Sequence, residues 1–156
     1  MQHHRGRVLA LDFGTKRVGA ALSDSTWSIA TPLETYVRQA PEADARHYRR
    51  LADEEGVERV VVGLPVHLSG RLGQTADLAR KWGDWLGEVL RLPVIFWDER
   101  FTTAEAENAL QDAGLTTKAR KNKRDMVAAT LLLQGYLDSG APLDPAPMAP
   151  LDEGPR

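Results

Sequence analysis

Two apolar runs near the N-terminus are separated by too few residues for any connection other than a hairpin. The first spans Arg7–Asp12 and the second Val18–Ser23, with only residues 13–17, including Gly14, between them. A parallel connection needs a crossover of roughly a dozen residues or more. The two runs are therefore predicted to form an antiparallel pair, onto which the rest of the chain must build.

Downstream of this hairpin, helical patterns alternate with strand patterns, which is typical of a layered α/β fold. In such folds, functional groups gather at the carboxyl ends of the parallel strands. The predicted elements are an edge strand near 27–35, a helix over 42–55 ended by Gly56, a strand over 57–62, a helix over 74–90, a strand over 93–97, a helix over 102–113 and a last helix over 123–137.

The length of 156 residues fits about one domain. Five of the nine prolines lie between Pro142 and Pro155, so we expect a folded domain over 5–139 and an extended tail over 140–156. The chain has no cysteine, which excludes disulfides and thiolate zinc sites. The net charge of −2 argues against a cationic surface throughout, and with neither a signal peptide nor a membrane span in the sequence we expect a cytoplasmic protein.

Acidic residues stand where this fold class places its chemistry. Asp12 ends the first strand, the pair Asp98 and Glu99 ends a later one, and Asp125 begins the last helix. Carboxylates from neighbouring strand ends can share a divalent cation, and a third from a packed helix would complete a two-metal site for Mg²⁺ or Mn²⁺. Taken singly, a strand-end aspartate such as Asp12 is more often structural, and Asp125 also suits a helix N-terminus without any function.

Two further patterns bear on these acids. Asp125 shares a helix face with Ala129, Leu132 and Tyr136, so its carboxylate continues an apolar stripe inward, where it needs a partner or a metal. Asp98 and Glu99 must point to opposite faces if the strand extends through both, and periodicity alone does not say which of them points toward the site.

The sequence resembles the YqgF/RuvX family of pre-16S ribosomal RNA nucleases and Holliday-junction resolvases, which have an RNase H-like fold. The resemblance covers nearly the whole domain. It rests on LALDFGTKRVGAALSD at 9–24, GLP at 63–65 with Gly70, DERFTT at 98–103 and DMVAATLLLQGYL at 125–137. One departure is VHLSG at 66–70, where the family usually carries a polar loop, so substrate contacts made by that loop are in question.

The resemblance implies a mixed central sheet of order 3-2-1-4-5 with one antiparallel strand, flanked by helices. It also implies that Asp12, Glu99 and Asp125 bind the metal, with Glu99 preferred over Asp98. The implied activity is divalent-metal-dependent hydrolysis of nucleic acid, either in pre-16S rRNA processing or in resolving branched DNA. A junction resolvase would need a homodimer, whereas a processor of single-stranded RNA could work as a monomer.

Cations crowd the segment directly before Asp125. A charge run is normally a solvated face, but beside a phosphodiester-cleaving centre it suits a polyanionic substrate. We interpret the segment as a loop that clamps the nucleic-acid backbone. Arg17 and Arg100 either add phosphate contacts or pair with the acids. The run comprises Lys118, Arg120, Lys121, Lys123 and Arg124.

Two other functions fit parts of the sequence. The segment DFGT at 12–15 also looks like the first phosphate-binding turn of actin-like ATPases, but those proteins bind nucleotide between two such α/β units, and this chain has room for one. The second alternative is a non-catalytic RNA-binding assembly factor that keeps the fold. The presence of all three acids argues against it.

Overall fold

A computed structural model describes residues 6–64, 70–98 and 117–143; for 70–74 and 117–122 it describes the backbone alone. The strands are β1 (Arg7–Phe13), β2 (Arg17–Ser23), β3 (Ala30–Val37), β4 (Val57–Leu64) and β5 (Val94–Asp98). The helices are α1 (Pro41–Glu55), α2 (Gly70–Leu90) and α4 (Thr117–Asp138). Within the described ranges, none of these helices is long and apolar enough to cross a membrane.

The five strands form one sheet of order β3-β2-β1-β4-β5. Strand β2 is antiparallel to both neighbours, while β1, β4 and β5 are parallel. The predicted order, the hairpin and the single antiparallel strand are therefore confirmed. Because β1, β4 and β5 are parallel, their carboxyl ends lie at the same end of the sheet, where side chains from separate parts of the chain meet.

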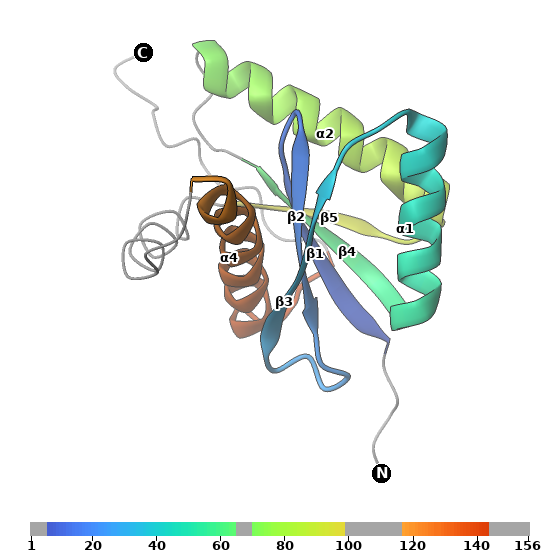
Figure 1. Ribbon diagram of the computed structural model, residues 1–156. Helices are drawn as coiled ribbons and strands as arrows, with labels where there is room; N and C mark the ends of the chain where they lie inside the picture. Colours follow the sequence, from blue (N-terminus) through green and yellow to red (C-terminus); the bar gives the residue numbers. More distant parts are fainter. Residues whose placement is uncertain (1–5, 65–69, 99–116, 144–156) are drawn as a thin grey trace, which may run out of the picture.

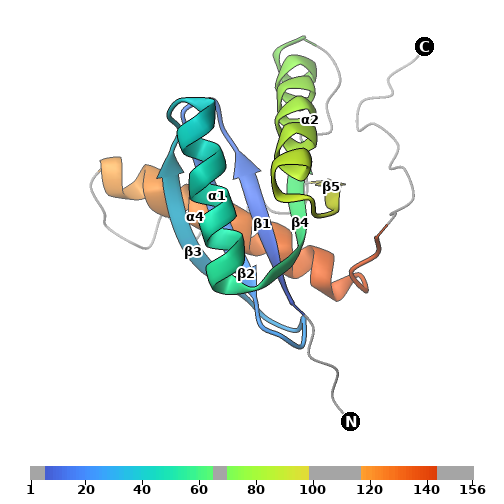
Figure 2. The ribbon, with the colours of Figure 1, turned by 90° about the vertical axis from the view of Figure 1, so that its right-hand side faces the viewer.

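Helices cover both faces of the sheet (Figures 1 and 2). Strand alternation sends Leu9 and Leu11 into the core beneath α1 and α2, where they pack with Tyr48 and Trp82. The alternate residues face α4 and pack against its apolar stripe. That second core includes Val8, Ala10, Ala21, Val61, Ile95, Ala129, Leu132, Leu133 and Tyr136.

Most element boundaries lie within two residues of the sequence prediction, but α2 begins at Gly70 instead of residue 74, and two other elements begin later or earlier than predicted for a physical reason. Strand β3 begins at Ala30, because the Asp24 carboxylate accepts hydrogen bonds from the backbone N–H groups of Ser28 (2.7 Å) and Ile29 (3.2 Å) and holds the preceding residues in a turn. Helix α4 begins at Thr117, so the basic segment predicted as a loop is helical. Lysine, arginine and alanine are strong helix formers, and like charge alone does not end a helix. The helix predicted over 102–113 lies outside the described residues.

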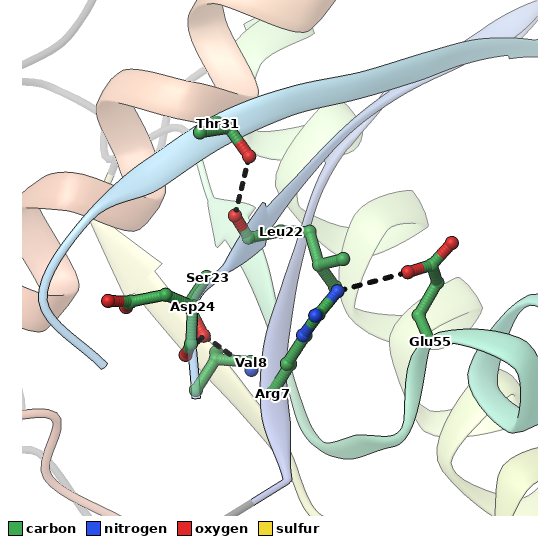
Figure 3. A network of polar contacts seen from close by, with 7 residues as sticks. All are labelled: Arg7, Val8, Leu22, Ser23, Asp24, Thr31 and Glu55. Atoms are coloured by element: carbon green, nitrogen blue, oxygen red, sulfur yellow. Dashed lines mark hydrogen bonds and ion pairs between the residues drawn. The ribbon is translucent and has the colours of Figure 1, made fainter. Parts of the chain in front are cut away.

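Polar contacts fasten the end of the sheet farthest from the strand-end acids (Figure 3). The Ser23 hydroxyl accepts a hydrogen bond from the N–H of Val8 (2.8 Å) and donates to the carbonyl of Asp24 (2.9 Å). Arg7 and Glu55 form an ion pair of 3.1 Å between β1 and α1. These contacts hold the beginning of β1, while its other end is left for the candidate site.

Candidate active site

Asp12 lies near the end of β1, on the face that α4 covers. Its position in the strand alternates with Leu11 and Phe13, which pack on the α1 and α2 side, and matches Ala10, which packs against α4. Across the hairpin, Asp12 is paired with Gly19 of β2. Paired residues of antiparallel strands present their side chains to the same face, so the α-carbon of Gly19 marks the space beside the Asp12 carboxylate.

Gly19 is a point of close contact between β2 and α4. A Cβ placed on Gly19 would overlap the carbonyl group of Asp125. Because glycine has no side chain, the helix backbone can lie directly on β2. The close contact brings Asp125 next to the strand pair that carries Asp12, so the structure brings together two of the three predicted acids.

Asp125 forms an ion pair with the side chain of Arg17. Its Oδ2 accepts a hydrogen bond from Nε of Arg17 at 3.1 Å, and the two side chains are 20% and 30% exposed. Of the two predicted roles for Arg17, phosphate contact or pairing with an acid, this structure displays the pairing. The pair borders a pocket of about 300 Å³ that is lined by Gly14, Thr15, Lys16, Arg17 and Asp125.

Asp98 ends β5 on the other face of the sheet. Val94 and Phe96 pack toward α1 and α2, Ile95 and Trp97 pack toward α4, and the alternation places Asp98 with the first group. Asp98 is 7% exposed and interacts with another group. The strand therefore directs Asp98 away from Asp12. The predicted Glu99 and Arg100 lie outside the described residues.

The basic residues lie within the first two turns of α4. Lys118, Arg120 and Lys121 belong to the helix, but their side chains lie outside the described part. Lys123 and Arg124 are exposed and directly precede Asp125. Cations at a helix N-terminus oppose the helix macrodipole, so this arrangement has no local electrostatic advantage.

The donor chemistry around Asp12 and Asp125 suits a hard cation. Carboxylate oxygens are ligands that Mg²⁺ and Mn²⁺ accept, and the two acids share one face of the sheet. Within the described ranges, no group of three or more histidine, cysteine, aspartate or glutamate residues is arranged to hold a metal. The predicted third acid, Glu99, is not among the described residues.

Two residues of this site region were not singled out from the sequence. Gly19 interrupts an apolar strand, and a glycine inside a strand is a sequence signal that another backbone approaches closely. Arg38, just after β3, donates from Nη1 to the carbonyls of Gly14 (3.2 Å) and Thr15 (3.0 Å). Nothing local in the sequence indicates this contact, because it depends on how β3 pairs with β2.

The sheet order, the acids at the end of β1 and on α4, and the covering helices define an RNase H-like fold of the kind found in nucleases that resolve DNA junctions. Two solved structures share the fold. RuvC of T. thermophilus in complex with a Holliday junction substrate has a TM-score of 0.54 at 14% identity, with 88% of this chain and 98% of that chain covered. The Fowlpox virus resolvase in complex with Holliday junction DNA has a TM-score of 0.52 at 13% identity, with 85% and 97% covered.

The chain belongs to the RuvX family, whose model, described as Holliday junction resolvase, matches residues 6–139. Its relatives include a protein of Desulforudis audaxviator, 45% identical over 133 residues, covering 85% of this chain and 94% of the relative. A protein of Halothermothrix orenii is 41% identical over 132 residues, with 85% and 94% covered. Both carry the name "Putative pre-16S rRNA nuclease".

Proposed function

We propose that this protein is a divalent-metal-dependent nuclease that hydrolyses phosphodiester bonds in nucleic acid in the cytoplasm. Its candidate substrates are the ones that its relatives and structural neighbours are named for, namely pre-16S rRNA and four-way junction DNA. Asp12, Glu99 and Asp125 are the proposed metal-binding acids. Asp98 is less favoured than Glu99, because alternation along β5 groups Asp98 with Val94 and Phe96 on the face opposite to Asp12.

The observation that carries the proposal is the contact between Gly19 and Asp125. It supports the proposal because Gly19 is paired with Asp12 across the hairpin and contacts Asp125 of α4, near the carboxyl ends of the parallel strands. Two carboxylates brought together near an open pocket are electrostatically unfavourable without a cation. In this structure Arg17 supplies one positive charge to Asp125.

The residues divide into two roles. Asp12, Glu99 and Asp125 would hold Mg²⁺ or Mn²⁺, which when bound activates water and stabilises the leaving oxygen of a phosphodiester. Lys118, Arg120, Lys121, Lys123 and Arg124, together with Arg17 and Arg100, are proposed to hold the nucleic-acid backbone through charge, without reading its sequence.

The experiment incubates the full chain with three labelled substrates, namely a pre-16S rRNA fragment, unstructured single-stranded RNA and four-way junction DNA, in Mg²⁺ or Mn²⁺. Asp12→Asn and Asp125→Asn are expected to reduce cleavage by about two orders of magnitude or more, since a lost metal ligand removes several kcal/mol of charge stabilisation. Asp138→Asn, at the exposed far end of α4, is the matched control and should cleave normally.

Chelator should abolish the activity. Cleavage of no substrate, or equal cleavage by Asp12→Asn, would contradict the proposal. RNA binding without cleavage would favour the assembly-factor alternative instead. A measurement of oligomeric state accompanies the assay, because resolving a junction needs a homodimer with two sites, whereas a monomer suffices for single-stranded RNA.

A further inference from the structure

The turn between β1 and β2 has its carbonyl groups fixed on one side. The Arg38 guanidinium donates to the carbonyls of Gly14 and Thr15, and the Arg38 backbone N–H donates to the carbonyl of Lys16 at 2.9 Å. The same guanidinium lies 4.9 Å from the ring centroid of Phe13. Three successive carbonyls are therefore directed toward one residue.

The position of Phe13 shows on which face of the sheet the Arg38 guanidinium lies. The Phe13 ring packs against Trp82 of α2, with centroids 5.1 Å apart, so the Arg38 guanidinium stands on the α1 and α2 side of the sheet. Asp125 and α4 lie on the opposite side. Arg38 does not line the 300 Å³ pocket, although the turn that it holds does.

Peptide geometry then fixes where the amides point. In a planar trans peptide, the N–H of each residue is directed opposite to the carbonyl of the residue before it. Since the carbonyls of Gly14 and Thr15 point to Arg38, the N–H groups of Thr15 and Lys16 point the other way, toward the α4 side. Consecutive backbone N–H groups facing one concavity form a binding site for an anion.

The charges on the pocket agree with an anionic occupant. Among the residues that line the pocket, Lys16 and Arg17 are positively charged and Asp125 is negatively charged, and Arg17 lies against the Asp125 carboxylate at 3.1 Å. The Asp12 carboxylate is not part of this lining. Thr15 and Lys16 are exposed, so an anion can reach the turn from solvent. Gly14 keeps the turn tight, because a Cβ there would press on the carbonyl of Arg17.

We propose that the turn Gly14–Arg17 is a phosphate subsite that takes one phosphodiester group of the substrate backbone beside Asp125. Arg38 is its positioning residue and touches no substrate. This inference rests on the proposed nuclease function for the identity of the ligand, whereas the anion site itself follows from the geometry of the turn.

The test is an amide-resolved NMR titration of the full chain without metal, at constant ionic strength. The probes are inorganic phosphate and a dinucleoside monophosphate, which carries a single phosphodiester. Both are expected to shift the amide resonances of Thr15 and Lys16 downfield with a saturable dependence. Silent amides at these two positions, or shifts confined to Lys123 and Arg124, overturn the subsite. Binding of inorganic phosphate alone overturns the phosphodiester assignment.

Arg38→Lys keeps the charge but replaces the planar guanidinium that spans both carbonyls. It is expected to weaken phosphate binding by about fivefold or more, whereas Arg50→Lys, on the exposed surface of α1, should leave binding unchanged. Equal affinity of Arg38→Lys and wild type overturns the role of Arg38; if Arg38→Lys does not fold, Arg38→Gln takes its place.

The titration separates the two proposals. Amides that respond in a chain without nuclease activity keep the subsite and reject the nuclease function. Active enzyme with silent amides rejects the subsite alone.

Discussion

Gly19 of β2 and Asp125 of α4 are in direct contact, and no residue with a side chain fits at position 19 while the helix stays where it is. The contact involves the backbone of Asp125, which cannot rotate out of the way as a flexible side chain would. A single hydrogen atom as the side chain of residue 19 thus sets the distance between a helix-borne carboxylate and the strand pair that carries Asp12.

Gly19→Ala is expected to push α4 off the sheet. Crowding a packed interface typically costs about 1–3 kcal/mol of unfolding free energy, and cleavage should fall along with it because Asp125 moves. Urea unfolding measures the first effect and the nuclease assay the second. The control is Gly135→Ala on the same helix, where a Cβ would meet only Nε1 of Trp97 at 3.9 Å.

Gly135→Ala should leave activity unchanged and raise the unfolding free energy by about 0.5–1 kcal/mol, since alanine favours a helix interior. An unchanged unfolding midpoint for Gly19→Ala would show that residue 19 does not set the position of α4.

The sequence has three tyrosines, and all resist ionisation in the folded protein. Burial, with a hydrogen bond to Asp44, raises the pKa of Tyr36 to about 12. Burial also raises the pKa of Tyr48, and that of Tyr136 despite the hydrogen bond from Arg59. At pH 10 the native protein should therefore show little phenolate absorbance, whereas the chain in urea should be about half ionised.

The same shifts give the sign of the alkaline stability change. Between pH 10 and 12 the folded protein retains phenolic protons that the unfolded chain releases, so the free energy of unfolding falls as pH rises. Urea unfolding across this range checks it. Tyr36→Phe should show a shallower decline, and identical slopes for variant and wild type would contradict the assignment.

The sequence predicted the parts of the fold that depend on local rules. Loop length identified the hairpin, alternating patterns identified the layered sheet, and spacing on the last helix identified the buried face of Ala129, Leu132 and Tyr136, which are at most 1% exposed. Each of these inferences needs only neighbours along the chain and the periods of helix and strand.

The remainder required contacts between distant segments. Arg38 contacts Gly14 and Thr15 because of the register in which β3 pairs with β2. Local sequence patterns do not predict that register. Strand β3 begins later than predicted because the Asp24 side chain accepts hydrogen bonds from the backbone. The periodicity of apolar residues gives no sign of these hydrogen bonds. The sequence prediction of a loop for the cations before Asp125 is wrong, because these residues belong to α4 and lysine, arginine and alanine have high helix propensity.

The ion pair between Arg17 and Asp125 should compete with a metal for the carboxylate. Arg17→Gln removes that competitor, and because a partly exposed pair contributes about 0.2–1 kcal/mol, Mn²⁺ is expected to bind up to about fivefold more tightly. Isothermal titration calorimetry without substrate measures this directly. Asp125→Asn should weaken Mn²⁺ binding.

The matched control is Arg7→Gln, which breaks the ion pair with Glu55 at the far end of β1 and should leave Mn²⁺ affinity unchanged. If Arg17→Gln binds Mn²⁺ more weakly than wild type, Arg17 supports the metal site rather than competing with it.

The exposed pair Lys123 and Arg124 tests the proposed backbone contact through its salt dependence. Reversing both charges, in an Asp12→Asn background without metal, should lower affinity for single-stranded RNA. Each lost phosphate contact reduces the slope of log affinity against log salt by about 0.7, so the slope should fall by about 1.4. Reversing Arg49 and Arg50 on α1 makes the same change in net charge on the opposite layer and should leave the slope near its original value. Equal slopes for the two double variants would mean that RNA responds to overall charge, and that the first turns of α4 make no specific contact.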